Sequence, residues 1–150
     1  MRVTIQRVSQ ASVKVDNKIV SSISKGLLIL LGIEDEDNKE DVEWLTGKIS
    51  KLRIFPDDKA PMNQSVINVN GDILVVSQFT LFASTKKGNR PSFTRSGDPN
   101  FAKDMYELFL NELSKKTGKI VQKGVFAANM KVSLINDGPV TINIDSRNRE

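Results

Sequence analysis

The sequence of 150 residues contains no cysteine and no histidine, and these two absences exclude much chemistry. Without cysteine the chain has no disulfide, no thiolate nucleophile and no cysteine-ligated zinc, which fits a reducing compartment. Without histidine it lacks the commonest general base, so a Ser-His-Asp triad and an H-E-x-x-H zinc site are both excluded. Any reaction at this protein must therefore proceed without imidazole or thiol.

Long apolar runs are also missing. The longest is the eight-residue run Gly26–Ile33, against the ~18 residues needed to cross a bilayer. The N-terminus has no basic segment followed by an apolar one, so no signal peptide is predicted. With 39% hydrophobic and 27% charged residues, the composition is typical of globular proteins. We expect a cytoplasmic protein with no membrane contact, folded as a single domain over residues 1–150.

Charge is unevenly distributed. The formal net charge is +4, yet residues 34–43 contain seven acids and one lysine. We interpret this acidic stretch as a solvated surface, because it lacks the alternating oxygens and the glycine of a calcium loop. Basic residues gather in two places, Lys86, Lys87, Arg90 and Arg95 in one and Lys115, Lys116, Lys119 and Lys123 in the other. Such clusters suit a polyanionic partner, although a solvated surface explains a charge run equally simply.

Alternating apolar residues predict a β-sheet. Strands are expected over residues 3–5, 11–15, 19–20, 27–31, 72–81, 120–126, 131–135 and 140–144, with a short one at 53–55. The run Leu27–Leu31 is typical of a strand buried on both faces. Turns are predicted at Asp16-Asn17 and at residues 136–139, and Asn70-Gly71 is a strong hairpin signal.

Two helices are predicted by apolar residues spaced three and four apart. The first covers residues 39–52, with Asn38 as its cap, and the second begins after Asp98 and ends at Gly118. Residues 83–99 form a long loop rich in Gly, Pro, Ser, Lys and Arg, where functional residues tend to lie. Two helices among eight or so strands predict an α+β fold with a mixed sheet curled like a barrel.

No motif in the sequence predicts a metal site, a nucleotide-phosphate cradle or a cofactor. What remains is a predicted strand that ends in hydroxyl residues, Ser77-Gln78-Phe79-Thr80, and then runs into the basic loop. Ser77 and Thr80 lack a neighbouring base, so as isolated residues they are ordinary polar positions of a strand. Their proximity to Lys86, Lys87 and Arg90 makes this region the candidate functional site.

Several strings of this region resemble the D-aminoacyl-tRNA deacylase family. They are Ser77-Gln78-Phe79-Thr80-Leu81, Lys87-Gly88-Asn89-Arg90-Pro91-Ser92-Phe93 and Asn136-Asp137-Gly138-Pro139-Val140-Thr141, with Gln6-Arg7-Val8 and Arg53-Ile54-Phe55 also matching. The resemblance extends in order over nearly the whole chain. One departure is that Asn129, before Met130, stands where the family usually has an acidic residue.

The resemblance implies a homodimeric enzyme that hydrolyses the ester joining a D-amino acid, or glycine, to the terminal adenosine of tRNA. It implies that Gly138-Pro139 is a cis peptide that reaches into the partner's pocket and rejects L-amino acids, with Phe126 and Met130 also in the substrate site. It implies catalysis assisted by the RNA, without a metal or a cofactor. The absence of histidine and cysteine agrees with this.

For such a reaction the backbone amides near Phe79 and Thr80 can stabilise the developing oxyanion, and the 2′-hydroxyl of the substrate can act as the base. Ser77, Gln78, Phe79 and Thr80 are therefore the predicted catalytic residues, and Lys86, Lys87 and Arg90 are predicted to hold tRNA. Two alternatives stay open. Thr80 could be a covalent nucleophile, or the protein could be a non-catalytic RNA-binding module that uses Phe93 for stacking.

Overall fold

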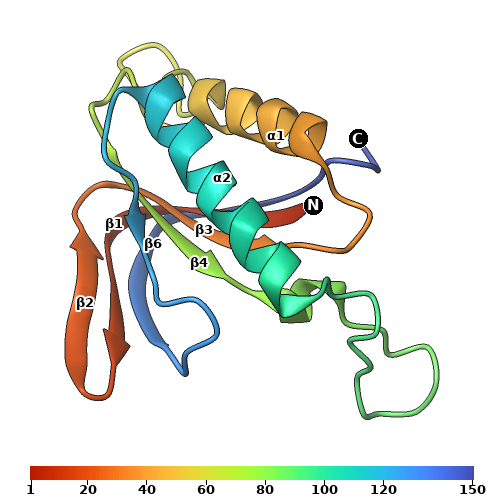
Figure 1. Cartoon of the computed structure of the whole chain (residues 1–150). Helices are drawn as coiled ribbons and strands as arrows, with labels where there is room; N and C mark the ends of the chain where they lie inside the picture. The colour runs from red at the N-terminus through yellow and green to blue at the C-terminus, as the bar shows by residue number, and fades with distance from the viewer.

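Strand β1 (Arg2–Val15) organises the sheet of the computed structural model, which describes all 150 residues (Figure 1). Along one edge it pairs first with β3 (Gly26–Gly32) and then with β2 (Lys18–Ile23), and along the other edge it pairs with β6 (Lys131–Asp145), all antiparallel. Strand β4 (Asp72–Ser77) lies parallel to β3, and the short β5 (Gln122–Lys123) lies parallel to β4. This mixed sheet curls into a nearly closed barrel, and the predicted α+β fold class is confirmed.

Two helices, α1 (Lys39–Lys51) and α2 (Pro99–Thr117), pack against each other over one face of the sheet (Figure 1). A core of 23 buried residues lies between them and the sheet, and a second cluster of seven lies within the curl of the strands. Leu27, Ile29 and Leu31 point into the larger core and Leu28 into the smaller one, so β3 is buried on both faces as predicted. Neither helix is both long enough and apolar enough to span a bilayer.

Both helices begin and end where the sequence predicts, because local chemistry fixes their ends. The Asn38 side chain accepts a hydrogen bond from the amide of Glu40 at 2.8 Å, while Asp41 accepts one from the Asn38 amide at 2.9 Å. Asp98 accepts one from the amide of Asn100 at 2.9 Å, and Gly118 ends α2 in the left-handed conformation. These bonds satisfy N–H groups that have no partner within the helix.

The predicted strand count of eight or so is wrong, since the sheet has six strands. Residues 3–15 form one continuous strand, residues 53–55 contribute only a bridge between Phe55 and Gln64, and only Gln122–Lys123 of the segment 120–126 is extended in the sheet. The chain leaves β4 after Ser77 and forms the 3-10 helix η1 (Phe79–Phe82), so the predicted strand over residues 72–81 is too long. Alternation over few residues does not distinguish a strand from such a turn.

The hairpin predicted at Asn70-Gly71 is also wrong. Asn70 does adopt a positive φ of 51°, and the Gly71 amide donates to the carbonyl of Val66 at 2.8 Å, so the turn itself is present. It leads into β4, however, and β4 is parallel to β3. A parallel pair needs a crossover rather than a two-residue turn, and α1 lies in the connection between these strands.

The turn predicted at residues 136–139 is a bulge inside one strand. In the pairing of β1 with β6, Gln6 faces Thr141 and Val8 faces Asn136, so residues 137–140 all stand opposite Arg7. The turn-forming residues are thus used to push Asp137, Gly138 and Pro139 out to solvent while β6 continues along β1. Tertiary pairing outweighs the local turn preference here.

The acidic stretch is less solvated than predicted. Glu34, Asp37 and Asp41 are all buried. The carboxylate of Asp37 pairs with the N-terminal ammonium group, and the Ser146 hydroxyl donates to Asp41 at 2.6 Å. Burial raises the pKa of Asp37 above its usual value, although the ammonium group beside it acts in the opposite direction. These partners are distant in the sequence, which is why the charge pattern did not indicate them.

Candidate active site

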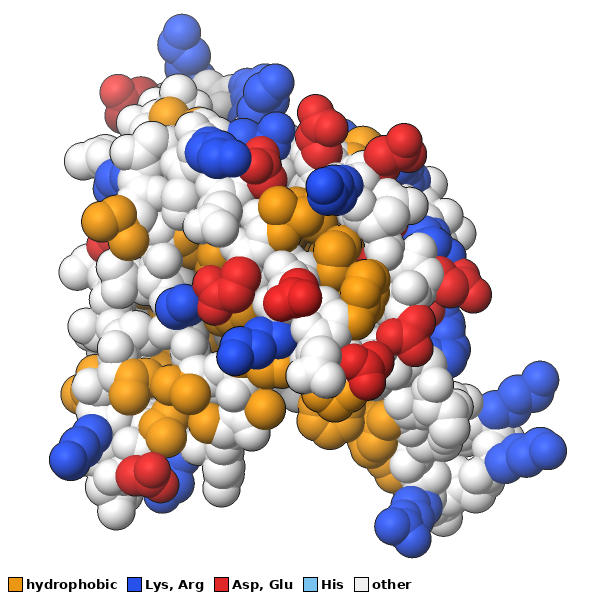
Figure 2. Space-filling model, viewed as in Figure 1, with side chains coloured by type: hydrophobic (Ala, Val, Ile, Leu, Met, Phe, Trp, Pro, Cys, Tyr) orange, Lys and Arg blue, Asp and Glu red, His pale blue; other side chains and the backbone are white.

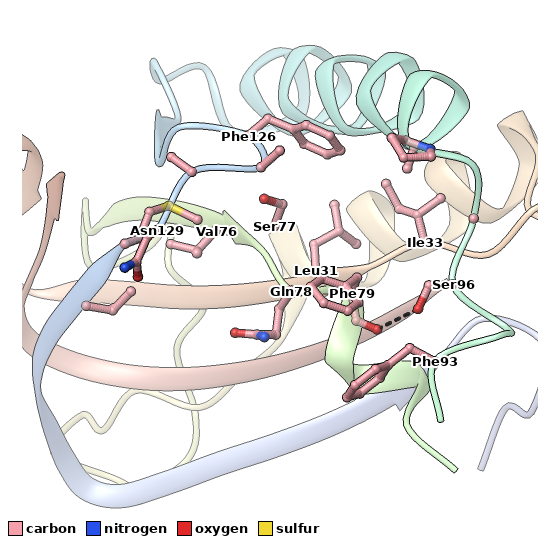
Figure 3. A pocket seen from close by; sticks show the side chains of 17 residues that line it. Leu31, Ile33, Val76, Ser77, Gln78, Phe79, Phe93, Ser96, Phe126 and Asn129 are labelled. Atoms are coloured by element: carbon pink, nitrogen blue, oxygen red, sulfur yellow. Dashed lines mark hydrogen bonds between the residues drawn. The ribbon is translucent and has the colours of Figure 1, made fainter. Parts of the chain in front are cut away.

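A cavity of about 620 Å³ opens where β4 ends and η1 begins (Figure 3). This volume is typical of sites for small organic groups. Eleven of its 17 lining residues are hydrophobic. The lining comes from four places: the ends of β3 and β4, residues 93–97, the start of α2, and the segment 126–130 with Val132.

The cavity brings together most of the predicted site residues from distant parts of the chain. Ser77, Gln78 and Phe79 line one side, and Phe126 and Met130 line another (Figure 3). Thr80, Gly138, Pro139, Lys86, Lys87 and Arg90 are not among the lining residues. The predicted catalytic and substrate residues therefore divide into those that form this cavity and those that lie outside it.

Helix η1 places backbone donors at the mouth of the cavity. The amide of Gln78 donates to the carbonyl of Leu31 at 2.7 Å, which ties the start of η1 to β3. Gln78 gives no side-chain cap to η1, and the first N–H groups of a helix have no partner within it. The Gln78 side chain instead donates to the Thr80 hydroxyl. The amides of Phe79 and Thr80 thus begin a helix that no side chain caps.

Two aromatic rings flank this mouth. Phe79 is 57% exposed, and its ring lies edge to face against Phe93 with the ring centroids 5.2 Å apart. The Ser96 hydroxyl donates to the Phe79 carbonyl at 3.1 Å (Figure 3). Residues 93–96 therefore hold η1 from the side of the basic loop.

The deep side of the cavity is stiffened by a buried tyrosine. The Tyr106 hydroxyl donates to the Val75 carbonyl at 2.8 Å, and its ring centroid lies 5.7 Å from that of Phe126. Burial, with a smaller contribution from Glu107, raises the pKa of Tyr106 far above its usual value. Tyr106 therefore stays protonated and keeps Phe126 in place.

The basic loop is anchored at its base and free at its tip. The amides of Ser84 and Ser92 exchange hydrogen bonds with each other's carbonyls, and Arg95 pairs with the buried Glu34 at 2.8 Å. The tip residues Lys86, Lys87 and Arg90 are exposed and belong to none of the ion pairs. Figure 2 shows basic side chains standing clear of the body at lower right, where this loop lies in Figure 1.

The second basic cluster is different. Lys115 pairs with Glu112, Lys119 with Asp72 and Lys123 with Glu107, all at 2.7–3.3 Å. These pairs lie toward the C-terminal end of α2, whereas the cavity is at its N-terminal end. The two clusters look alike in sequence, but only the loop offers three unpaired cations.

Arg7 is a residue whose importance the sequence analysis missed. Its Nε donates to the Asp137 carbonyl at 2.7 Å and its Nη1 to the Ile54 carbonyl at 2.6 Å. A Cβ on Gly138 would lie 2.9 Å from Arg7 Nη2, so the guanidinium packs directly against the bulge. Gly138-Pro139 is a cis peptide. The strings around Arg7, Ile54 and Asp137 occur together in the resemblance, and that was the available signal.

The structure holds no group of three or more acidic side chains arranged to bind a metal ion. Only Asp57, Glu112, Asp41 and Asp145 among the carboxyl groups have a pKa below the usual value, and none lines the cavity. What converges on the cavity mouth is therefore a set of backbone donors, aromatic rings and, from the loop, cations. This arrangement suits the binding of an ester on a polyanionic carrier.

Comparisons with known proteins identify the family. A family model described as D-Tyr-tRNA(Tyr) deacylase matches residues 4–145. Proteins named D-aminoacyl-tRNA deacylase from Flavobacterium johnsoniae and Parabacteroides distasonis are 62% and 57% identical over 150 residues, covering 100% of each chain. A solved structure named c-Myc DNA Unwinding Element Binding Protein has a TM-score of 0.90 at 38% identity, covering 97% of this chain and 98% of that one.

These matches define a class of enzyme, the deacylases. The chain belongs to the D-Tyr-tRNA(Tyr) deacylase family, so the predicted resemblance is confirmed. A structure of a probable eukaryotic D-amino acid tRNA deacylase, 19% identical with a TM-score of 0.81, shares the fold over 95% of this chain and 98% of that one.

Proposed function

We propose that this protein hydrolyses the ester bond of D-aminoacyl-tRNA and of mischarged glycyl-tRNA, and so removes these residues before they enter translation. Membership in the family supports this function, and so do the relatives named D-aminoacyl-tRNA deacylase. The observation that carries the proposal is the uncapped start of η1 at the mouth of the cavity beside the basic loop. The cavity would take the terminal aminoacyl-adenosine, and the loop would hold the tRNA backbone.

In the proposed reaction, water adds to the ester carbonyl carbon and the carbonyl oxygen becomes an oxyanion. The amides of Phe79 and Thr80 donate to this oxyanion, a contribution worth about 3 to 4 kcal/mol per donor. The 2′-hydroxyl of the terminal ribose accepts the proton of the attacking water and passes a proton to the departing 3′-oxygen. The products are the free amino acid and tRNA, and no side chain of the protein changes its protonation state.

We propose that selection of chirality depends on Gly138 and Pro139 of a second subunit. The bulge that carries them is exposed and outside the cavity of its own chain. In a twofold dimer each bulge can enter the cavity of the other chain, because a twofold interface uses the same surface twice. Sedimentation should give about twice the chain mass of 16.7 kDa. A monomer that is fully active would contradict this arrangement.

The wall would select by exclusion. Backbone carbonyls held by Arg7 cannot move as a side chain does, since its guanidinium donates to the Asp137 carbonyl at 2.7 Å. An L-amino acid would direct its Cβ against this wall, a D-amino acid would direct it to solvent, and glycine has no Cβ. Tolerance of chemically different D-amino acids follows, because the side chain is not recognised.

The alternative in which Thr80 is a covalent nucleophile makes a different prediction for Thr80→Ala. The Thr80 hydroxyl accepts from Gln78 and does not line the cavity. We expect Thr80→Ala to lower kcat only about fivefold, as for the loss of one hydrogen bond, because the backbone amide remains. Loss of a true nucleophile costs about 10⁶ in rate. A loss on that scale in the folded variant, or a trapped acyl-Thr80 ester, would favour the covalent route.

The other alternative is a nucleic-acid-binding protein without catalysis, as the name of the structural relative at 38% identity describes for that protein. The exposed Phe79, the adjacent Phe93 and the free cations of the loop would serve binding equally well. Turnover separates the two functions. Catalytic amounts of protein should release many equivalents of D-amino acid from D-aminoacyl-tRNA, whereas a binding module would protect the ester or leave it unchanged.

A further inference from the structure

Gly124 lies directly before the cavity wall formed by residues 126–130, and it is buried. An ideal Cβ at this position would lie 2.6 Å from the sulfur of Met130. It would lie 3.7 Å from the Met130 terminal methyl and from one Val76 methyl. The Met130 thioether therefore occupies the space that any side chain at position 124 would need.

The backbone at Gly124 is fixed. Its amide donates to the Val75 carbonyl at 3.0 Å, and that same carbonyl accepts the Tyr106 hydroxyl at 2.8 Å. Val75 is fully buried in β4 and Tyr106 is 1% exposed. If a methyl group were added at position 124, the backbone could not retreat without breaking this pairing.

The Met130 side chain is the part that can move. Methionine is unbranched and flexible, and Met130 is only half-buried. On one side it packs against the smaller core cluster, which contains Val76, and on the other it lines the cavity. A thioether displaced from Gly124 and Val76 has the cavity as its open space (Figure 3).

We propose that Gly124 is a positioning residue for substrate binding. Because it has no side chain, it forms a notch that holds the Met130 thioether in the wall and keeps the cavity open for the terminal aminoacyl-adenosine. The inference rests on the proposed function in naming that substrate. The notch acts on binding and not on the oxyanion donors of η1, which lie on a different side of the cavity.

The test is a double-mutant cycle on Gly124→Ala and Met130→Ala. With D-aminoacyl-tRNA as substrate, Gly124→Ala should raise KM about tenfold, the scale of an overpacked side chain, with kcat nearly unchanged. Relative to Met130→Ala, the double variant should show no such rise, because no thioether remains to be displaced. Gly47→Ala is the control, since nothing lies within 4 Å of a Cβ there; its KM should match the wild type.

Two results would overturn the proposal. One is a Gly124→Ala enzyme with the wild-type KM, and the other is the same KM rise in the presence and absence of Met130. If Gly124→Ala fails to fold while the double variant folds, the thioether cannot move into the cavity, and this too contradicts the proposal. A crystal structure of Gly124→Ala separates this question from the activity: the Met130 sulfur should lie in the cavity, even if the wild type proves to have another substrate.

Discussion

Gly26→Ala should abolish folding, which is the largest effect on stability that we expect from a single methyl group. A Cβ on Gly26 would lie 1.9 Å from the carbonyl oxygen of Asp72 and 2.7 Å from its amide nitrogen. Both atoms belong to backbone at the start of the parallel pair of β3 and β4. Because neither strand can yield without separating, the cost should exceed about 4 kcal/mol, the range of exceptionally damaging substitutions.

The effect of Gly26→Ala bears on the site as well as on the fold. The β3–β4 pair that begins at Gly26 and Asp72 ends at Leu31 and Ser77, where the Leu31 carbonyl accepts the Gln78 amide and so positions η1. Circular dichroism and chemical denaturation measure the outcome. Gly47→Ala, inside α1, is the control and should gain about 0.5–1 kcal/mol. A Gly26→Ala chain that unfolds at the wild-type denaturant midpoint would show that the two strands are not in this register.

Neutralising the tip of the basic loop should have the largest effect on substrate binding. In the variant Lys86→Gln/Lys87→Gln/Arg90→Gln, the plot of log affinity for tRNA against log salt should flatten by about 2 to 3, since each phosphate that the loop no longer neutralises reduces the slope by about 0.7 to 0.9. KM should rise at moderate salt while kcat changes little, because η1 is untouched. Binding titrations at several salt concentrations and steady-state kinetics measure the two effects.

The second basic cluster supplies a control with the same reduction in charge. Lys115, Lys119 and Lys123 are each paired with an acid within the chain, and exposed pairs of this kind contribute only about 0–1 kcal/mol to stability. The variant Lys115→Gln/Lys119→Gln/Lys123→Gln should therefore keep most of the wild-type salt dependence. Equal flattening in both triple variants would mean that net charge, and not the loop, attracts the tRNA.

The features predicted correctly from the sequence are those fixed by neighbours along the chain. Asn38 and Asp98 cap the helices through bonds that reach two or three residues ahead. Asp16 and Asn17 both adopt positive φ in the predicted turn. The buried run Leu27–Leu31 is a strand with both faces covered, because a continuous apolar run has no polar side to present to water.

The features that were missed depend on partners far away in the sequence. Asn136-Asp137-Gly138-Pro139 has the chemistry of a turn, but β1 holds β6 in one strand and converts the turn into a bulge opposite Arg7. The carboxylate of Asp37 is buried because the N-terminal ammonium group meets it. No local pattern contains these pairings.

The candidate site divides along the same line. Ser77, Gln78 and Phe79 were expected beside one another, and the resemblance added Phe126 and Met130, which the fold brings to the same cavity. Arg7 was quoted only as part of a matching string, although it joins the bulge to Ile54. The roles of Gly138 and Pro139 stay predictions, because the cavity of the same chain does not contain them.

The most direct test of the central claim is turnover of matched esters. The wild-type protein, at catalytic concentration, is incubated with the same tRNA charged with D-tyrosine, with L-tyrosine and with glycine, and released amino acid is counted per protein molecule. The account predicts many turnovers with the D-tyrosyl and glycyl esters and no release above the spontaneous rate with the L-tyrosyl ester. Equal cleavage of the D and L esters would contradict selection by a carbonyl wall, and no turnover of any ester would contradict the proposed function itself.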